Sequence, residues 1–314
     1  MKEPKSIELT EVLAKLKPVF DLLCHTGENC PFVVDTATHI ALVSPKLRER
    51  FHLSGEVLTG FNDAWIPLIY PEDKEAYIES IGAMLRKEPN AEHNMTYRVK
   101  AGSGEYVWIH CHAAVDYKSL GMPVFAGYIT LLDSAVYTDS ATGLLNENTY
   151  ELKLKEILEE KEAEGLAMIF RLSDFSFFSA ACPVKMTDAL LREVGAVMEG
   201  ALKEKHIVYK LEGADYGMVF LGRDHAYGEQ IYKEVETAVS KFCEQRGWLV
   251  ESKGKSQAAL YVTAGGVLFP SDGREPESLL HNMRAALEMA NPEEHRCCFF
   301  SEKGYAEWLR KVFD

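Results

Sequence analysis

The chain opens with apolar residues at helical spacing. Between residues 7 and 23 an apolar side chain recurs at about every third or fourth position, at Leu13, Leu16, Val19, Phe20 and Leu23. That period places the side chains along one face of a helix. We therefore predict an N-terminal helical segment within residues 1–29.

Shorter apolar runs with the length and composition of strands come next. PFVVD (31–35) and HIALVS (39–44) predict a strand pair, and two helical regions follow at 45–53 and 63–85. Three longer strand patterns lie at 94–100, 105–117 and 123–133, separated by the turns AGSG and KSLGM. Five strands with helices between them favour a five-stranded antiparallel sheet, an α+β domain over residues 30–134.

From residue 139 onward, helical and strand patterns alternate. Helices are predicted at 149–163, 188–204, 228–247 and 275–290, and strands at 165–173 and 257–269. The stretch YKLEGADYGMVF (209–220) has two apolar runs around a glycine-containing turn, which predicts a β-hairpin. The alternation predicts an α/β domain at 139–301 with helices packed on a sheet, and a helical tail at 302–314.

Length and composition agree with two folded domains. The 314 residues are 47% hydrophobic and 26% charged, and their formal net charge of −14 disfavours nucleic-acid binding. No apolar run reaches the roughly 18 residues that span a bilayer, and the N-terminus lacks a signal-peptide pattern. We therefore expect a cytoplasmic chain without a membrane segment. Seven scattered cysteines without CxxC spacing favour idle, reduced thiols.

Two motifs in the first half resemble those of PAS sensor domains. Tyr70-Pro71-Glu72-Asp73 is similar to the family's "hPeD" motif before a helix, and Tyr97-Arg98 followed by GSGEYVWI resembles its "yR-dG-yrWi" hairpin. The resemblance implies a domain that senses a small-molecule ligand, whose identity the sequence does not give, or that mediates pairing. Trp65, Trp108 and Phe125 are the candidates for lining the pocket, and filling the core is the favoured alternative for all three.

The second half begins with Asp139-Ser-Ala-Thr-Gly-Leu-Leu-Asn146, which resembles the "D-x-L-T-G-L-x-N" opening of GGDEF domains. The resemblance implies a nucleotidyl-cyclase-like, ferredoxin-like fold and a bacterial protein of cyclic di-GMP signalling. The hairpin at 209–220 takes the place of the family's GGDEF or GGEEF sequence. Because only residues 134–138 separate the domains, too few for a stable helical lever, we expect signals to pass by direct packing.

The family's reaction joins two GTP molecules, and it needs carboxylates for metal ions and cations for phosphates. The resemblance places Arg171 at the first metal carboxylate, Ser176 at the phosphate lysine and Ser179 at the guanine-reading asparagine. The second guanine-reading residue persists as Asp188, although a carboxylate that opens a helix is favoured without such a role.

The hairpin departs furthest from the family. Its positions are filled by Glu212, Gly213, Ala214, Asp215 and Tyr216, so that the metal-binding acid is an alanine and the last acid is shortened to aspartate. Farther on, the phosphate-binding lysine and arginine are replaced by Asn291 and His295. The inhibitory product site, "R-x-x-D" in the family, runs here from Lys203 to His206 and lacks the arginine fork.

Together these substitutions favour a degenerate GGDEF domain that signals without catalysis. We expect no metal or cofactor in it, and Mg²⁺ and GTP belong only to the alternative, a weak or altered diguanylate cyclase. An ion pair from Arg171 to Asp215 and Glu212 is our hypothesis for the former metal pocket. The rival hypothesis is that Arg171 and Lys210 clamp a nucleotide phosphate.

The resemblance also implies partners. We expect a homodimer or a signalling partner protein, and a natural protein that continues past Asp314 into an EAL phosphodiesterase domain. No flavin is expected at Cys30, because GENCPF (27–32) precedes the first strand, whereas the similar flavin motif follows two strands. His110 and His112 share one strand face without an evident third metal ligand, and no haem is expected at His39, His52 or His93.

Overall fold

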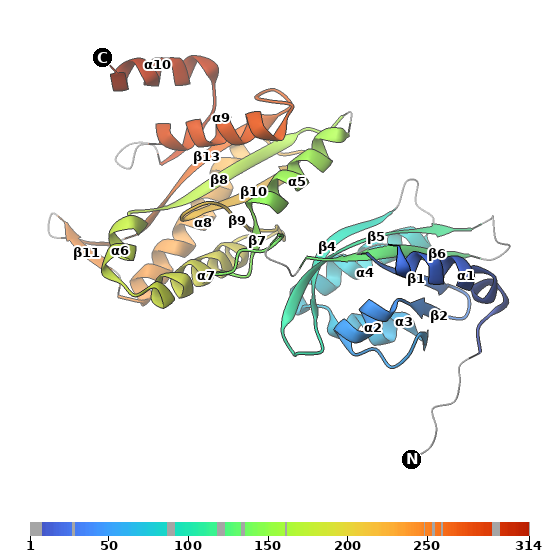
Figure 1. Ribbon diagram of the computed structural model, residues 1–314. Helices are drawn as coiled ribbons and strands as arrows, with labels where there is room; N and C mark the ends of the chain where they lie inside the picture. The colour runs from blue at the N-terminus through green and yellow to red at the C-terminus, as the bar shows by residue number, and fades with distance from the viewer. Residues whose placement is uncertain are drawn as a thin grey trace. The chain divides into compact units, whose positions relative to one another are not determined.

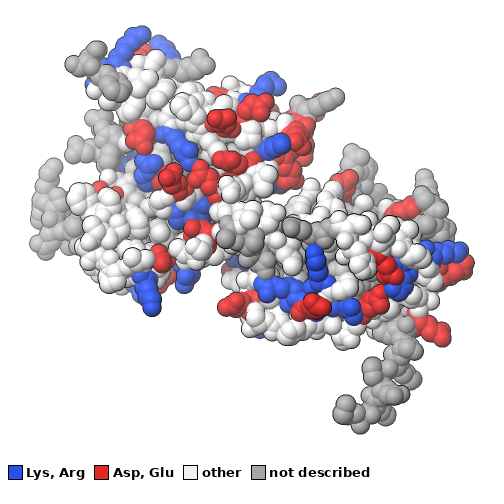
Figure 2. Space-filling view, viewed as in Figure 1, with Lys and Arg blue, Asp and Glu red and all other residues white. Residues whose placement is uncertain are grey.

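The computed structural model describes residues 8–26, 29–86, 92–117, 123–132, 136–160, 162–247, 249–252, 255–258, 260–290 and 296–313. The chain forms two compact units, Met1–Ser134 and Ala135–Asp314 (Figure 1). Each unit has its own sheet and its own hydrophobic core. On the face of the molecule seen in Figure 2, acidic and basic side chains are interspersed over both units.

The first unit is built on one antiparallel sheet. Among the described residues it has six strands in the order β3-β2-β1-β6-β5-β4. They are β1 (Cys30–Asp35), β2 (Ile40–Val43), β3 (Val57–Thr59), β4 (His93–Lys100), β5 (Tyr106–Asp116) and β6 (Val124–Leu131). The sheet expected from the sequence had five strands. The sixth, β3, pairs with β2 and is too short for an alternating pattern to be visible in the sequence.

Helices cover both faces of this sheet. Phe32 and Val34 of β1 belong to the core that contains residues of α2, α3 and α4, whereas Val33 packs with α1 on the other face. The helical elements are α1 (Glu11–His25), α2 (Pro45–Phe51), α3 (Phe61–Trp65), α4 (Lys74–Leu85) and the 3₁₀ turns η1 (Ile66–Leu68) and η2 (Pro71–Asp73). As expected, α2 begins at Pro45, and the Ser44 hydroxyl caps it by accepting from the Leu47 N–H at 3.4 Å.

One ion pair joins the two motifs of the first unit. Asp73, which is buried, accepts hydrogen bonds from Arg98: Nη2 lies 3.1 Å from Oδ1, and the backbone N–H lies 2.7 Å from Oδ2. The guanidinium also lies 4.0 Å from the Tyr70 ring centroid and 5.0 Å from that of Trp108. The pair therefore fixes the start of α4 against β4.

His93 belongs to the aromatic interior of the first unit. It is fully buried, its Nδ1 lies 2.9 Å from the Ser80 hydroxyl, and its ring meets the edge of Tyr77. Its Nε2 has no hydrogen-bond partner among the described residues. Burial lowers the pKa of His93 from 6.5 to about 4, with a smaller contribution from His110 and His112.

The second unit is built on a mixed sheet with the order β14-β13-β8-β10-β9-β7. Antiparallel pairing joins β13, β8, β10 and β9, and parallel pairing adds the short strands β7 and β14 at the edges. The strands are β7 (Leu145–Asn146), β8 (Gly165–Ser173), β9 (Tyr209–Lys210), β10 (Asp215–Leu221), β13 (Tyr261–Phe269) and β14 (Cys297–Phe299). A separate hairpin is formed by β11 (Leu249–Ser252) and β12 (Lys255–Ala258).

Helices lie on both faces of this sheet (Figure 1). They are α5 (Glu147–Glu159), α6 (Phe175–Ala181), α7 (Val184–Ala201), α8 (His225–Gln245), α9 (Pro276–Met289) and α10 (Glu302–Phe313). Gly217 and Gly265 flank Ile169 in register, and a side chain at these glycines would meet the Tyr150 ring of α5 and the backbone of α9. These glycines let both helices approach the sheet closely.

Several elements of the second unit differ from the sequence prediction. Helix α7 begins at Val184 rather than at 188, α6 was not predicted, and the strand expected from 257 begins at Tyr261, after the separate hairpin. The predicted helical tail corresponds to α10, whose Tyr305 ring contacts His281 of α9. No helix in the described part of the chain combines the length and the apolar character needed to cross a bilayer.

Removing the carboxylate of Asp73 should destabilise the first unit by about 3–5 kcal/mol, because the nearly buried guanidinium of Arg98 loses its buried carboxylate acceptor. We expect this for Asp73→Ala, measured as the free energy of unfolding in urea. Glu72→Ala is the control: its carboxylate lies 3.7 Å from Arg98 but is mostly exposed, so the expected loss is below about 1 kcal/mol. Equal losses for both variants would contradict a structural role for the buried pair.

The depressed pKa of His93 predicts acid sensitivity. In the unfolded chain the imidazole of His93 is protonated below about pH 6.5, whereas in the folded chain it stays neutral down to about pH 4. The free energy of unfolding therefore falls as the pH drops through that window. The loss from this residue should be about 3 kcal/mol. His93→Leu should remove that part of the pH dependence of unfolding, whereas His25→Leu, at the exposed C-terminal end of α1, should keep it. An unchanged slope in His93→Leu would exclude the residue as its source.

Candidate functional site

The hairpin at the centre of the second sheet is a tight turn between β9 and β10. The Leu211 N–H donates to the Asp215 carbonyl at 2.9 Å, and the Asp215 N–H donates to the Glu212 carbonyl at 3.2 Å. Gly213 has a φ of +61°, a conformation that favours glycine. Ala214 is buried in the hydrophobic core, and its carbonyl accepts from the Leu172 N–H of β8 at 3.0 Å. Burial of Ala214 and its hydrogen bond to β8 therefore hold the turn against the core.

Arg171 and Asp215 lie directly opposite each other on β8 and β10. The guanidinium donates from Nε to Oδ1 at 2.8 Å and from Nη2 to Oδ2 at 3.0 Å, a two-pronged contact. Its remaining nitrogen, Nη1, donates to Oε1 of Glu288 on α9 at 2.7 Å. The hydrogen bond to Asp215 raises the pKa of Arg171, outweighing the opposite effect of partial burial. Arg171 is thus a permanent cation held by two carboxylates.

The ion pair hypothesised from the sequence is present in part. Asp215 is a partner of Arg171, as expected, but the second carboxylate bound to it is Glu288 and not Glu212. Glu212 is exposed on the turn, and its backbone N–H donates to Oε2 of Glu147 at 3.0 Å. Glu288 was missed because it lies 117 residues along the chain, and no local pattern points to it.

Lys210 does not reach the surface beside Arg171. It is buried, and its Nζ donates to the carbonyls of Leu211 and Gly213, both at 2.6 Å. A third carbonyl, that of Asp215, lies 3.4 Å away. Burial lowers the pKa of Lys210, and nearby carboxylates, Asp139 first, oppose that effect. Because the Lys210 ammonium donates to carbonyls of the hairpin turn, it does not lie beside Arg171 in a position to clamp a nucleotide phosphate, as the rival hypothesis required.

The opening motif of this unit builds the turn that leads into α5. Asp139 Oδ1 accepts from the Thr142 N–H at 2.8 Å and from its hydroxyl at 2.7 Å. Gly143 follows with a φ of +76°, and Asn146 caps α5 by accepting from the Thr149 N–H at 3.1 Å. The first residue of α5, Glu147, then binds both the hairpin N–H and Arg284 of α9. The motif therefore positions Glu147 beside the hairpin.

The remaining sequence candidates of this unit that the structure describes lie on α6, α7 and β10. Ser176 is exposed on α6, and its carbonyl accepts from the Ser179 hydroxyl at 3.0 Å. Asp188 lies in the second turn of α7, so the expectation that it opens the helix is corrected by the earlier start at Val184. Tyr216 is buried and donates to the Leu191 carbonyl at 2.7 Å. Asn291 and His295 lie outside the described residues.

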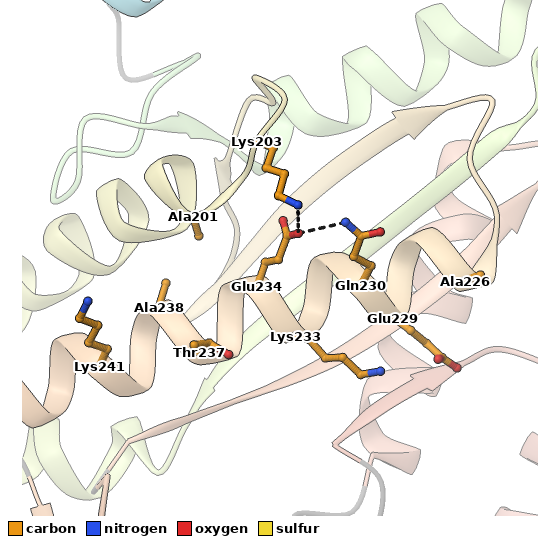
Figure 3. Close-up of a pocket in the computed structure, with 10 residues that line it drawn as sticks. All are labelled: Ala201, Lys203, Ala226, Glu229, Gln230, Lys233, Glu234, Thr237, Ala238 and Lys241. Atoms are coloured by element: carbon orange, nitrogen blue, oxygen red, sulfur yellow. Dashed lines mark hydrogen bonds and ion pairs between the residues drawn. The ribbon is translucent and has the colours of Figure 1, made fainter.

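The two ends of the expected inhibitory site belong to different environments. Lys203 lines an open groove of about 610 Å³ along α8, where it lies 3.9 Å from Glu234. Figure 3 shows Lys203 and Gln230 converging on that carboxylate. His206 instead lies 3.1 Å from the Tyr227 hydroxyl and packs on Phe220, and burial lowers its pKa. They therefore do not form one product-binding pair.

Two of the three pocket candidates of the first unit lie in its core. Trp65 and Phe125 face one aromatic interior, where Trp65 Nε1 donates to the Tyr97 hydroxyl at 3.1 Å. The gap between these rings is too narrow for a water molecule. Trp108 is also buried, but it lies on the opposite face of β5 from Val107 and Ile109, where its ring packs on Arg98. In this conformation Trp65 and Phe125 fill the core.

Two histidines of β5 lie beside hydroxyl groups. Nδ1 of His110 lies 3.0 Å from the Thr96 hydroxyl, and Nδ1 of His112 lies 3.3 Å from the Tyr128 hydroxyl. His39 and His52 stand at turn positions with positive φ. Cys30 is buried at the start of β1. The described residues contain no group of three or more side chains suited to holding a metal ion.

Comparison with known proteins assigns both units to families. Residues 136–297 match the family described as "Diguanylate cyclase, GGDEF domain", and residues 40–129 match the family described as "PAS fold". An uncharacterized signaling protein of Caulobacter vibrioides is 28% identical over 155 residues. That alignment covers 48% of this chain but only 18% of the relative, so the chain spans less than a fifth of that protein's length.

Two solved structures illustrate the likeness. The GGDEF domain of TpbB (YfiN) from Pseudomonas aeruginosa is 18% identical with a TM-score of 0.45, covering 56% of this chain and 99% of that one. A sensory box/GGDEF family protein from Caulobacter crescentus is 23% identical with a TM-score of 0.40, covering 49% and 97%. Because the cyclase-domain match spans half of the sequence and follows the PAS match, the chain belongs to the GGDEF family, with a PAS domain before its GGDEF domain.

Proposed function

We propose that this protein signals without catalysis. In this proposal the GGDEF domain is a regulatory or interaction module of a cyclic di-GMP pathway, and the PAS domain controls it through a small ligand or through pairing. The observation that carries the proposal is the contact of Arg171 with Asp215 and Glu288 at the place where the family binds its metal ions.

The residues at this place do not suit a divalent cation. Mg²⁺ takes oxygen ligands at about 2.0–2.1 Å in near-octahedral geometry. Both oxygens of Asp215 already accept hydrogen bonds from Arg171, and the methyl group of Ala214 offers no acceptor. A metal ion at Asp215 would stand within a few ångströms of a fixed cation, and like charges at that distance repel strongly. The contacts therefore support a closed site.

The proposal extends to partners and to the cell. A module without its own reaction acts by contact, so we propose a homodimer or a partner protein as its target, in the cytoplasm. The natural protein would be longer and carry an EAL phosphodiesterase domain whose activity this module adjusts.

A weak or altered diguanylate cyclase is the second candidate, favoured by the family membership, by the persisting Asp188 and by the carboxylate that Asp215 still offers in place of the family's longer acid. Such an enzyme would need Mg²⁺ and GTP, and Arg171 would have to leave Asp215 before a metal ion could bind. The two candidates differ in whether GTP is consumed.

Incubation with GTP and Mg²⁺ or Mn²⁺ should yield no cyclic di-GMP, because loss of two metal carboxylates lowers catalysis by orders of magnitude. Product would be measured by chromatography and mass spectrometry beside a GGDEF domain that retains both carboxylates. Product formation by the wild-type chain that is lost when Asp215 is changed to Asn would instead establish the enzyme.

Arg171→Met should destabilise the GGDEF domain by about 1–3 kcal/mol, because Asp215 and Glu288 lose their shared cation. The expected loss of stability is smaller than for a fully buried pair, because the Arg171 side chain is 36% exposed and solvent screens its charge. The measurement is the free energy of unfolding in urea. Arg246→Met removes an exposed pair with Glu193 and should cost less than about 1 kcal/mol. Equal losses of stability in the two variants would show that the ion pairs of Arg171 with Asp215 and Glu288 do not stabilise the domain more than an exposed pair does.

A further inference from the structure

Residues 136–138, the last of the segment between the two domains, are bound to the start of α5. The Asn146 side-chain amide donates to the Val136 carbonyl at 3.0 Å, and the Asn146 N–H donates to the Tyr137 carbonyl at 2.9 Å. The Thr149 hydroxyl donates to the same Tyr137 carbonyl at 2.8 Å. These hydrogen bonds hold the entering chain against the first turn of α5, so a displacement of one moves the other.

The start of α5 also holds the hairpin, and it does so at two points. Before the helix, β7 pairs in parallel with β9, so that Asn146 lies opposite Lys210. On the helix, Oε2 of Glu147 accepts from the N–H of Glu212 in the turn at 3.0 Å. Glu147 is the first residue of α5, where the helix dipole favours a carboxylate. A movement of this helix end therefore reaches the hairpin through strand pairing and through one side chain.

The other oxygen of the Glu147 carboxylate extends the contact to α9. Oε1 accepts from Nη2 of Arg284 on α9, which packs beside α5 (Figure 1). Glu288 lies four residues after Arg284 and therefore on the same face of α9. Glu288 accepts from Arg171, which also binds Asp215 of the hairpin. The contacts thus form a closed ring that runs from α5 through α9 and β8 to the hairpin and back to α5.

We propose that this ring is a conformational relay that branches at Glu147. A displacement of residues 136–138 moves the first turn of α5, and the Glu147 carboxylate passes the movement to the hairpin turn and to α9. This inference rests on the proposed role of the GGDEF domain as a module that the PAS domain controls, and it names the residues that carry the control. The relay uses contacts within the chain and needs neither a metal ion nor a nucleotide.

The exposure of the ring suits a relay. The side chains of Arg284 and Glu288 are 43% and 55% exposed, so solvent screens their ion pairs. Such pairs can break and re-form without unfolding of the domain. Asp215, in contrast, is buried and fixes one end of the ring to β10. The ring therefore has one anchored end and one end that can follow α5.

Amide hydrogen exchange of the full chain, measured by mass spectrometry of peptides from the hairpin and from α9, tests the relay. Thr149→Val removes the hydroxyl that binds Tyr137 but keeps the N–H that caps α5 through Asn146. It should speed exchange in both the hairpin and α9 by about fivefold, the effect of losing one hydrogen bond. The hairpin and α9 respond because both are bound to the helix end that the variant loosens.

Two background variants show which residue carries the movement. In an Arg284→Leu background, Thr149→Val should still speed exchange in the hairpin but no longer in α9, because the branch to α9 is already broken. In a Glu147→Ala background the effect on α9 should be lost as well, and the effect on the hairpin should persist only through the β7–β9 pairing. Glu151→Ala is the matched control: Glu151 is exposed one turn later on α5, and Thr149→Val should keep its full effect there.

The relay would be overturned if Thr149→Val left exchange in α9 unchanged, or if its effect on α9 stayed the same in the Arg284→Leu and Glu147→Ala backgrounds. Circular dichroism shows whether each variant keeps the wild-type fold, and Arg284→Leu decides the question by itself if Glu147→Ala does not fold. The exchange is measured without GTP. Formation of cyclic di-GMP would overturn the proposed function without altering these rates, so the two failures are distinguishable.

Discussion

The arrangement of the GGDEF domain depends on one cross-strand pair. Residues 171 and 215 stand directly opposite each other in the two central strands, so their side chains must meet. Two carboxylates at such positions would need a cation between them. With arginine at 171 the cation is part of the chain, and its geometry matches the carboxylate in two hydrogen bonds. The third contact, to Glu288, ties the same cation to α9, so one side chain connects two strands and a helix.

The partners of this arginine show how far sequence reasoning reaches. Asp215 could be predicted because strand alternation and the resemblance to the family both place it opposite residue 171. Glu212 was also expected to bind Arg171, but it lies in the hairpin turn, where its side chain is exposed. The next residue, Gly213, has a positive φ, so the alternation of a strand does not continue through the turn. Glu288 could not be predicted, because the docking of α9 on the sheet depends on tertiary packing and not on any local period.

The fold shows the same limit. Long periodic segments such as β8 and α8 were predicted within a few residues, because many apolar positions define their period. The three residues of β3 and the aromatic and serine sequence of α6 contain no such period. Trp108 is buried as expected, although alternation along β5 places it on the opposite face from Val107 and Ile109, against Arg98. The motif around Tyr97 and Arg98 proved more informative, since Arg98 binds Asp73 of the other motif.

The start of α5 connects the end of the interdomain segment with the hairpin. The Tyr137 carbonyl accepts hydrogen bonds from the Asn146 N–H at 2.9 Å and from the Thr149 hydroxyl at 2.8 Å. Glu147, between those two residues, accepts the Glu212 N–H of the turn. The first residues of the second unit and the hairpin turn are thus held by the same helix end. The position of the hairpin turn is therefore tied, through α5, to the residues that enter the second unit.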